Sequence, residues 1–123
     1  MAHLLLVADD IWVKNDVAAA VTDPGTTLES SDEPEAAAEL LGSRHFDAAI
    51  VDMQVKNMGG MAITRLLQDA IAGGDAAHTP IVLLLDRQAD VFLAKRAGAD
   101  AFLVKPFTSQ QLRAALGSFL PAG

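Results

Sequence analysis

The sequence predicts a doubly wound α/β fold, with five helices around a five-stranded parallel sheet. First, residues 3–8, 47–52 and 81–85 form short, almost wholly apolar runs, which are typical of strands covered by helices on both faces. Second, amphipathic helical patterns alternate with these runs, and such alternation favours right-handed crossovers in a parallel sheet. Third, the chain has 123 residues, which is the size of one ordinary domain.

The first half of the chain is expected to hold three strands and two helices. The strands are expected at residues 3–8, 26–30 and 47–52, and the helices from about 11 to 21 and from 34 to about 41. Four apolar residues recur at helical spacing in the first helix: Val13, Val17, Ala20 and Val21. Trp12 lies off this stripe, so it is expected to be only partly buried. Pro34 suits the first turn of the second helix, with Ser31 or Asp32 as its N-cap.

The second half is expected to add two strands and three helices. An irregular loop is expected at residues 53–60. The helices are expected at 61–72, 86–96 and 109–120, and Thr108 or Ser109 is the expected N-cap of the last one. The strands are expected at 81–85 and 101–104.

The polarity of the strands predicts their order in the sheet. The second strand is polar and suits a sheet edge, whereas the first is apolar throughout and suits the centre. The order 2-1-3-4-5 satisfies both. It places the topological switch, where ligands bind in such sheets, between the first and third strands.

Composition excludes several classes of function. The chain has no cysteine, which rules out disulfides, thiolate metal sites and cysteine nucleophiles. Its formal net charge of −7 argues against a nucleic-acid partner, which would require clustered Lys and Arg. No apolar run approaches the ~20 residues of a membrane span, and the amino end lacks the pattern of a signal peptide. A cytoplasmic, soluble protein without membrane attachment is expected.

Three acids follow the two strands that flank the predicted switch. Asp9 and Asp10 come directly after the first strand, and Asp52 ends the third. The carboxyl ends of these strands meet at one edge of the sheet, so the three carboxylates are expected to gather in one crevice. Such a pocket is costly unless a cation fills it. The alternative is that these acids only cap helices and turns.

These acids belong to a wider pattern. Asp9-Asp10, Asp52 about forty residues later and Lys105-Pro106 after the last strand together resemble the receiver domain of bacterial two-component response regulators. Residues 55–60 and 97–107 also resemble segments of that family, and the likeness extends over the whole chain. It implies one receiver domain over residues 1–123, with no output domain.

The resemblance assigns a role to each residue of the pattern. Asp52 matches the phosphoryl acceptor, which is also a ligand of Mg²⁺ in the family. Asp10 matches a direct Mg²⁺ ligand, Asp9 the acid that holds the metal through water, and Gln54 the residue that offers its backbone carbonyl. Lys105 matches the lysine that neutralises the acceptor and then the phosphoryl oxygens. Mg²⁺ prefers oxygen ligands and keeps several waters, so this donor set suits it.

The sequence departs from the family pattern at the residues that switch. Leu85 stands where receivers usually have Thr or Ser, and it cannot donate a hydrogen bond to a phosphoryl oxygen. Asp86 stands where a small residue is usual and adds a fourth negative charge. Phe102 matches the aromatic that reports phosphorylation by rotating inward, and Leu85 is expected to fill the space beneath it. Lys56 replaces the usual proline, and the stretch from Leu85 to Lys105 is about two residues short.

The resemblance implies a signalling module that is not an enzyme. It would take a phosphoryl group from a histidine kinase or a phosphotransfer protein. A downstream partner, or a second copy in a homodimer, would dock on the face of the fourth helix, fifth strand and fifth helix, near Val91, Lys95 and Arg96. One alternative is a degenerate receiver that binds a partner without phosphorylation. A flavodoxin-like FMN binder is disfavoured, because Asp9-Asp10 would repel a phosphate.

Overall fold

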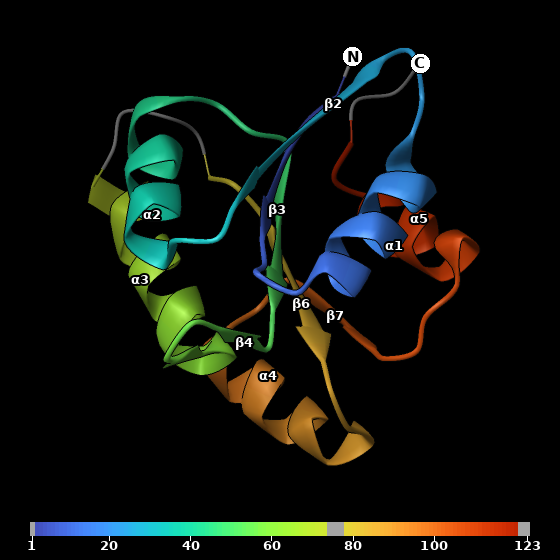
Figure 1. Cartoon of the computed structure of the whole chain (residues 1–123). Helices are drawn as coiled ribbons and strands as arrows, with labels where there is room; N and C mark the ends of the chain where they lie inside the picture. The colour runs from blue at the N-terminus through green and yellow to red at the C-terminus, as the bar shows by residue number, and fades with distance from the viewer. Residues whose placement is uncertain (1, 74–77, 121–123) are drawn as a thin grey trace.

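A computed structural model describes residues 2–73 and 78–120 of the chain. In this part of the chain, five parallel strands form one sheet with helices on both faces (Figure 1). The strands are β1 (Ala2–Val7), β2 (Thr26–Ser31), β3 (Ala48–Asp52), β6 (Ile81–Leu85) and β7 (Ala101–Val104). Their order, β2-β1-β3-β6-β7, confirms the predicted order 2-1-3-4-5.

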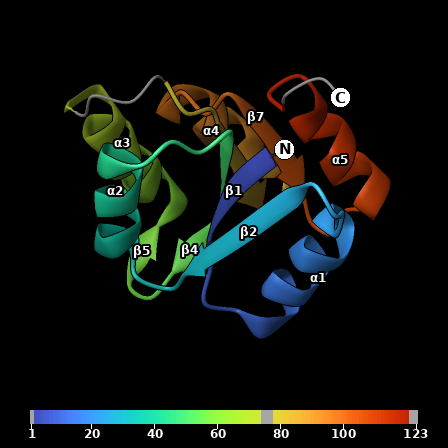
Figure 2. The same ribbon diagram turned by 90° about the horizontal axis from the view of Figure 1, so that it is seen from above.

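Helices cover the sheet in two layers, as Figure 2 shows from above. One layer consists of α1 (Ile11–Val21) and α5 (Ser109–Gly117). The other consists of α2 (Pro34–Ser43), α3 (Gly60–Gly73) and the short α4 (Val91–Ala97). The two layers enclose separate hydrophobic cores, one on each side of the sheet. The predicted stripe of α1 is buried in the core that α1 shares with α5.

The central strands contribute to both cores at once. Along β1, Leu5 and Val7 pack toward α2 and α3, while Leu4 and Leu6 pack toward α1 and α5. All four side chains are fully buried, and β3 and β6 alternate in the same way. A strand that is buried on both faces has no polar positions to spare, which explains the uninterrupted apolar runs in the sequence.

Two acids make matching pairs of hydrogen bonds at the amino edge of the sheet. Just before β3, the Asp47 carboxylate accepts a hydrogen bond from the backbone N–H of His3 (2.7 Å), and Asp47 N–H donates to His3 C=O (2.8 Å). Just before β7, Asp100 makes the same pair of bonds with Ile81 (2.8 and 2.9 Å). Each pair of hydrogen bonds joins the starts of two neighbouring strands.

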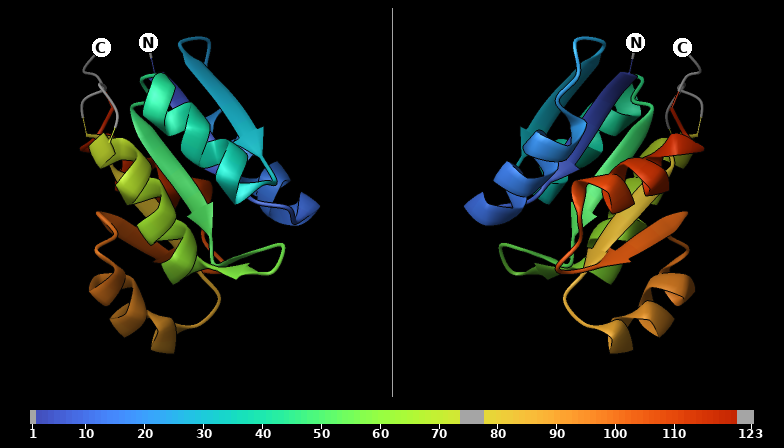
Figure 3. Two further views of the ribbon diagram at one scale, coloured as in Figure 1. Left: turned by 90° about the vertical axis from the view of Figure 1, so that its left-hand side faces the viewer. Right: turned by 90° about the vertical axis from the view of Figure 1, so that its right-hand side faces the viewer.

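The prediction of an irregular loop at residues 53–60 was wrong. Gln54–Val55 (β4) and Met58–Gly59 (β5) pair as a small antiparallel hairpin, which projects from the end of β3 (Figure 3). Its two loop residues are Lys56 and Asn57, and Lys56 has a φ of 57°. A tight hairpin loop requires such a left-handed residue, and the position usually carries glycine. Without glycine there, the hairpin is hard to see in the sequence.

Two helix starts also differ from expectation. The N-cap of α2 is Glu33, because Ser31 still belongs to β2 and its hydroxyl accepts a hydrogen bond from Glu33 N–H (3.2 Å). Residues 86–96 do not form one helix: a 3-10 turn at Gln88–Asp90 precedes α4, which has 7 residues. The predicted Thr108 cap of α5 is confirmed by a capping box with Gln111.

Candidate functional site

The predicted site residues lie at the carboxyl edge of the sheet. Asp9 and Asp10 follow β1, Asp52 is the last residue of β3, and Lys105 follows β7. A cavity of about 380 Å³ opens at this edge. It is lined by Asp10, Trp12, Val13, Asp16, Asp86, Lys105, Pro106 and Phe107.

Lys105 joins two acids of this edge. Its Nζ donates hydrogen bonds to Asp52 Oδ1 and to Asp86 Oδ1, the latter at 3.0 Å. The Asp52 side chain is 4% exposed and that of Asp86 is 54% exposed. Lys105 therefore connects a buried carboxylate to one that faces solvent. Its backbone N–H donates to Leu85 C=O (2.8 Å), which fixes the root of the side chain against β6.

Burial and pairing act against each other on this pair. Burial raises the pKa of Asp52 above its ordinary value, although hydrogen bonds from Lys105 and from Met53 N–H oppose the rise. Burial alone would lower the pKa of Lys105, but its bonds to Asp52 and Asp86 outweigh that effect and raise the pKa. The lysine is therefore held in its charged form beside the acid.

Asp9 and Asp10 each have a structural contact in addition to any chemical role. Asp10 is the N-cap of α1, because its Oδ1 accepts from Trp12 N–H (2.8 Å). Asp9 Oδ2 accepts from Lys56 N–H (2.8 Å), which ties the β4–β5 hairpin to the end of β1. The capping alternative therefore holds for Asp10. Both residues remain exposed to solvent.

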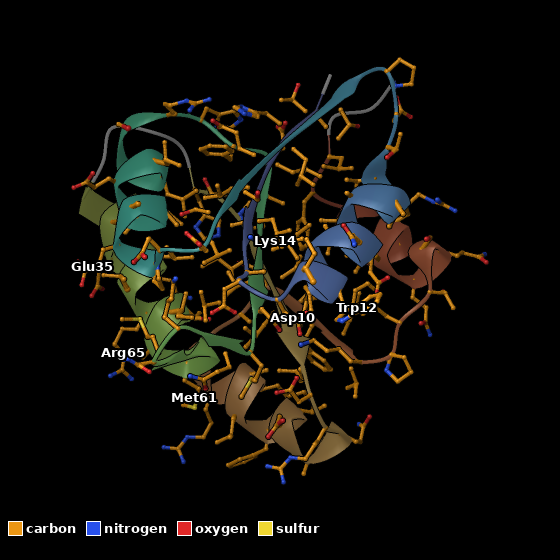
Figure 4. The ribbon with its side chains drawn as sticks, in the orientation of Figure 1. Asp10, Trp12, Lys14, Glu35, Met61 and Arg65 are labelled. Atoms are coloured by element: carbon orange, nitrogen blue, oxygen red, sulfur yellow. The ribbon has the colours of Figure 1, made fainter. Side chains whose placement is uncertain are left out.

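Trp12 lies next to Asp10 at the start of α1, as the sticks in Figure 4 show. Its side chain is 74% exposed, so the expectation of partial burial was wrong. The buried stripe of α1 packs against the sheet, whereas Trp12 belongs to the first turn and borders the cavity that holds Lys105. Trp12 thus lies close to Asp10 and is open to solvent.

The donor set suits Mg²⁺ chemically. Within residues 2–73 and 78–120, no three His, Asp or Glu side chains already lie close enough together to hold a metal ion. The hydrogen bonds above use one oxygen each of Asp9, Asp10 and Asp52, which leaves the second oxygen of each carboxylate for an ion. Gln54 lies two residues after Asp52, in β4. Closing this oxygen-rich set around Mg²⁺ would require the carboxylates to move together.

The residues predicted to switch lie beside the site without entering it. Leu85 is fully buried at the end of β6, in the core beneath α2 and α3. Phe102 is partly buried, packs against the same core and pairs with Leu83 across the β6–β7 ladder. A leucine at this place offers the cavity no hydrogen-bond donor. The inward rotation of Phe102 stays a prediction.

Sequence reasoning missed the contact between Asp86 and Lys105. Asp86 was expected only to add a negative charge to the site, yet it is paired with the lysine. A signal for the pair does exist, because Leu85 is opposite Val104 in the parallel ladder of β6 and β7. Asp86 and Lys105 each come one residue later, so the strand register alone predicts that they meet. Predicting this contact requires the register of β6 and β7, which the sequence alone does not give.

The comparison with known families decides the identity. The model of the response regulator receiver domain matches residues 4–117. The chain belongs to this family. Response regulator protein PmrA of Pseudomonas aeruginosa is 30% identical over 114 residues, covering 91% of this receiver domain and 49% of the regulator. Probable histidine kinase 5 of Oryza sativa subsp. japonica is 32% identical over an alignment 142 positions long, which covers 96% of this chain and 12% of the kinase.

Solved structures agree on the fold. The receiver domain of a sensor histidine kinase from Pseudomonas aeruginosa, with a magnesium ion in its active site cleft, has a TM-score of 0.81 at 22% identity, covering 96% of each chain. The chemotaxis response regulator CheY4 of Vibrio cholerae has a TM-score of 0.79 at 27% identity, covering 98% of this receiver and 99% of CheY4. The receiver spans about half the length of the bacterial response regulators that it matches. No helix among the described residues is long and apolar enough to cross a membrane.

Proposed function

We propose that this receiver domain accepts a phosphoryl group on Asp52, with Mg²⁺ as cofactor. The observation that carries the proposal is the buried Asp52 carboxylate at the end of a central strand, hydrogen-bonded by the charged Lys105. Phosphoryl transfer requires little covalent chemistry from the protein beyond a positioned nucleophile and neutralised charge. Asp52 supplies the first and Lys105 contributes to the second.

In the proposed step, a carboxylate oxygen of Asp52 attacks the phosphorus of a phosphohistidine. The P–O bond of an acyl phosphate forms as the P–N bond breaks, and the imidazole leaves with its electron pair. Lys105 then shares its ammonium with the phosphoryl oxygens. Mg²⁺, held by Asp10, Asp52 and the carbonyl of Gln54, with Asp9 acting through water, would neutralise the remaining negative charge. The domain thereby acts as the acceptor of the phosphoryl group.

The proposed partners follow from this role. The donor is a histidine kinase or a phosphotransfer protein, which carries the phosphohistidine. The proposed docking face for a downstream partner or a second copy centres on α4, where Lys95 and Arg96 are exposed. Phe92 is 64% exposed and lies under the Arg96 guanidinium, 5.7 Å from ring centroid to Cζ. Val91, expected on this face, is partly buried against the core instead.

The test is labelling by a small-molecule donor. The domain is incubated with acetyl phosphate and Mg²⁺, and its intact mass is measured over time. Wild type should gain one phosphoryl group and Asp52→Asn none, because the variant keeps the shape of the residue but lacks the nucleophile. If folded wild type gains no mass, the acceptor role is wrong and a phosphorylation-independent binding module becomes the better reading.

A further inference from the structure

The contact between Asp86 and Lys105 has a consequence for the reaction. A lysine ammonium has three N–H donors. In this domain one points at Asp52 and one at Asp86, which lies 3.0 Å away. Asp86 also borders the cavity next to Asp52, together with Asp10, Asp16 and Lys105 itself. A phosphoryl group arriving at Asp52 therefore meets a lysine that is already shared with a second anion.

We propose that Asp86 is a built-in competitor for Lys105, which slows phosphoryl transfer to Asp52 by holding the ammonium that the phosphoryl oxygens need. The inference rests on the proposed function, because it concerns the rate of that same reaction. Asp86 touches neither Asp52 nor the reacting atoms, so it acts as a positioning residue through Lys105. It is a resident anion that must give way before the phosphoryl group is fully neutralised.

The geometry favours competition over a simple surface ion pair. An ion pair between two fully exposed side chains usually contributes little to stability. Here both residues follow directly from paired positions in β6 and β7, so the backbone itself sets them opposite each other. The Lys105 side chain is only 24% exposed and is anchored at its other contact by buried Asp52. The ammonium group is therefore restricted to a position between its two carboxylates.

The rival explanation is a general field effect, in which any acid near the cavity repels the donor. Asp16 offers a matched control, because it is an exposed acid that lines the same cavity. Among the described residues, its carboxylate makes no ion pair with Lys105. Neutralising Asp16 thus removes one negative charge from the cavity and leaves the contact between Asp86 and Lys105 in place.

The experiment compares four proteins: wild type, Asp86→Asn, Asp86→Glu and Asp16→Asn. The initial rate of labelling by acetyl phosphate with Mg²⁺ is followed by intact mass, and thermal unfolding checks that each variant is folded. Asp86→Asn should label at least about tenfold faster than wild type. Asp86→Glu keeps the charge and should restore a rate close to that of wild type. Asp16→Asn should change the rate by no more than about twofold, because exposed charges are screened by salt.

Three results would overturn the inference. Equal rates for wild type and Asp86→Asn would show that Asp86 does not compete. A rate for Asp86→Glu as high as for Asp86→Asn would show that the charge is not the cause, and an equal gain from Asp16→Asn would assign the effect to the general field. In each of these cases wild type still labels, so the proposed function survives. If no variant labels, the proposed function fails and the inference falls with it.

Discussion

The Asp86 carboxylate lies 3.0 Å from the Lys105 ammonium, and the same ammonium also binds the buried Asp52. The fourth negative charge of the site is therefore paired within the domain, but with a cation that it shares with Asp52. This pairing changes the meaning of Asp86, because a paired acid repels an incoming anion less than a free one but occupies the cation that the anion needs. In the proposed reaction, the rate of phosphoryl transfer to Asp52 therefore depends on how readily Lys105 leaves Asp86.

Restoring a hydroxyl at position 85 should speed labelling. Leu85→Thr introduces a donor at the end of β6, and one preorganised donor is commonly worth about 3 kcal/mol of barrier. We expect labelling by acetyl phosphate to rise at least about tenfold, which takes only ~1.4 kcal/mol. The control is Leu85→Val, which has the shape of threonine without the hydroxyl. Equal rates for the Thr and Val variants would show that the missing donor does not limit the reaction.

Trp12 should report metal binding. It adjoins Asp10, is 74% exposed and is the single tryptophan of the chain. Mg²⁺ or Mn²⁺ at the Asp10 carboxylate would change the charge beside the indole, so its fluorescence should change on titration. Asp10→Asn should reduce that change, and Asp23→Asn, far from this cavity in the turn before β2, should not. A silent wild type, both by fluorescence and by calorimetry, would contradict an intact metal site.

Asp52→Asn should stabilise the fold at neutral pH. Burial raises the pKa of Asp52, so the ionised acid is less stable in the folded domain than in the unfolded chain. Replacing it removes this cost, and Asp86 remains to pair Lys105. We expect urea unfolding at pH 7 to show a higher midpoint for the variant than for wild type. The gain should shrink as pH falls through the raised pKa toward 3.8, because the wild-type acid then becomes neutral. A loss of stability at pH 7 would show that pairing with Lys105 outweighs burial.

Glu29 should make the fold sensitive to acid. The Arg44 guanidinium binds both of its oxygens (3.0 and 2.9 Å), and these bonds lower the pKa of Glu29 below 4.5. Its stabilising effect is complete above 4.5 and is lost as pH falls through the lowered pKa. Glu29→Gln should therefore lower the urea midpoint slightly at pH 7, with no difference from wild type in strong acid. Because the pair is exposed, the difference should also fade in high salt; one that persists there would point to packing.

Alanine at Lys95 and Arg96 should weaken association through α4. These two residues are the basic, exposed part of a helix that also presents Phe92 to solvent. For a partner or a second copy that docks there, each lost charge should slow association, most clearly at low salt. Sedimentation or pull-down with wild type and the double variant measures the effect. Arg65→Ala, on α3, provides a basic exposed control outside this helix. Unchanged binding in the double variant would place the interface elsewhere, and an equal loss from Arg65→Ala would indicate a general effect of charge.

The order of the strands could be predicted because it depends on which runs are apolar throughout. The positions of the site carboxylates could also be predicted, because the end of each apolar run marks the end of a strand and therefore the edge of the sheet. The β4–β5 hairpin could not, because its loop residue Lys56 adopts a left-handed conformation that glycine usually marks. A sequence pattern does not predict a left-handed backbone at a residue type that disfavours it.

Contacts between residues far apart in the sequence were the second feature that could not be predicted. The acid Asp86 was visible in the sequence, but its partner depends on the register of β6 and β7. The exposure of Trp12 depends on where the first turn of α1 lies relative to the sheet, which helical periodicity does not state. In both cases the sequence shows the residue but not the contacts or exposure of its side chain.

The two-sided burial of the central strands creates a problem of alignment. Every residue of β3 and β6 is buried, so sliding either strand by one residue would exchange its two faces with little change in hydrophobic burial. Polar contacts at the ends of the strands therefore help to define the correct register. Asp47 and Asp100 contribute at one edge, where each carboxylate accepts a hydrogen bond from the backbone of the neighbouring strand. At the opposite edge Asp52 is hydrogen-bonded to Lys105 in the native alignment. The acid proposed to receive phosphate also helps to mark how the sheet must assemble.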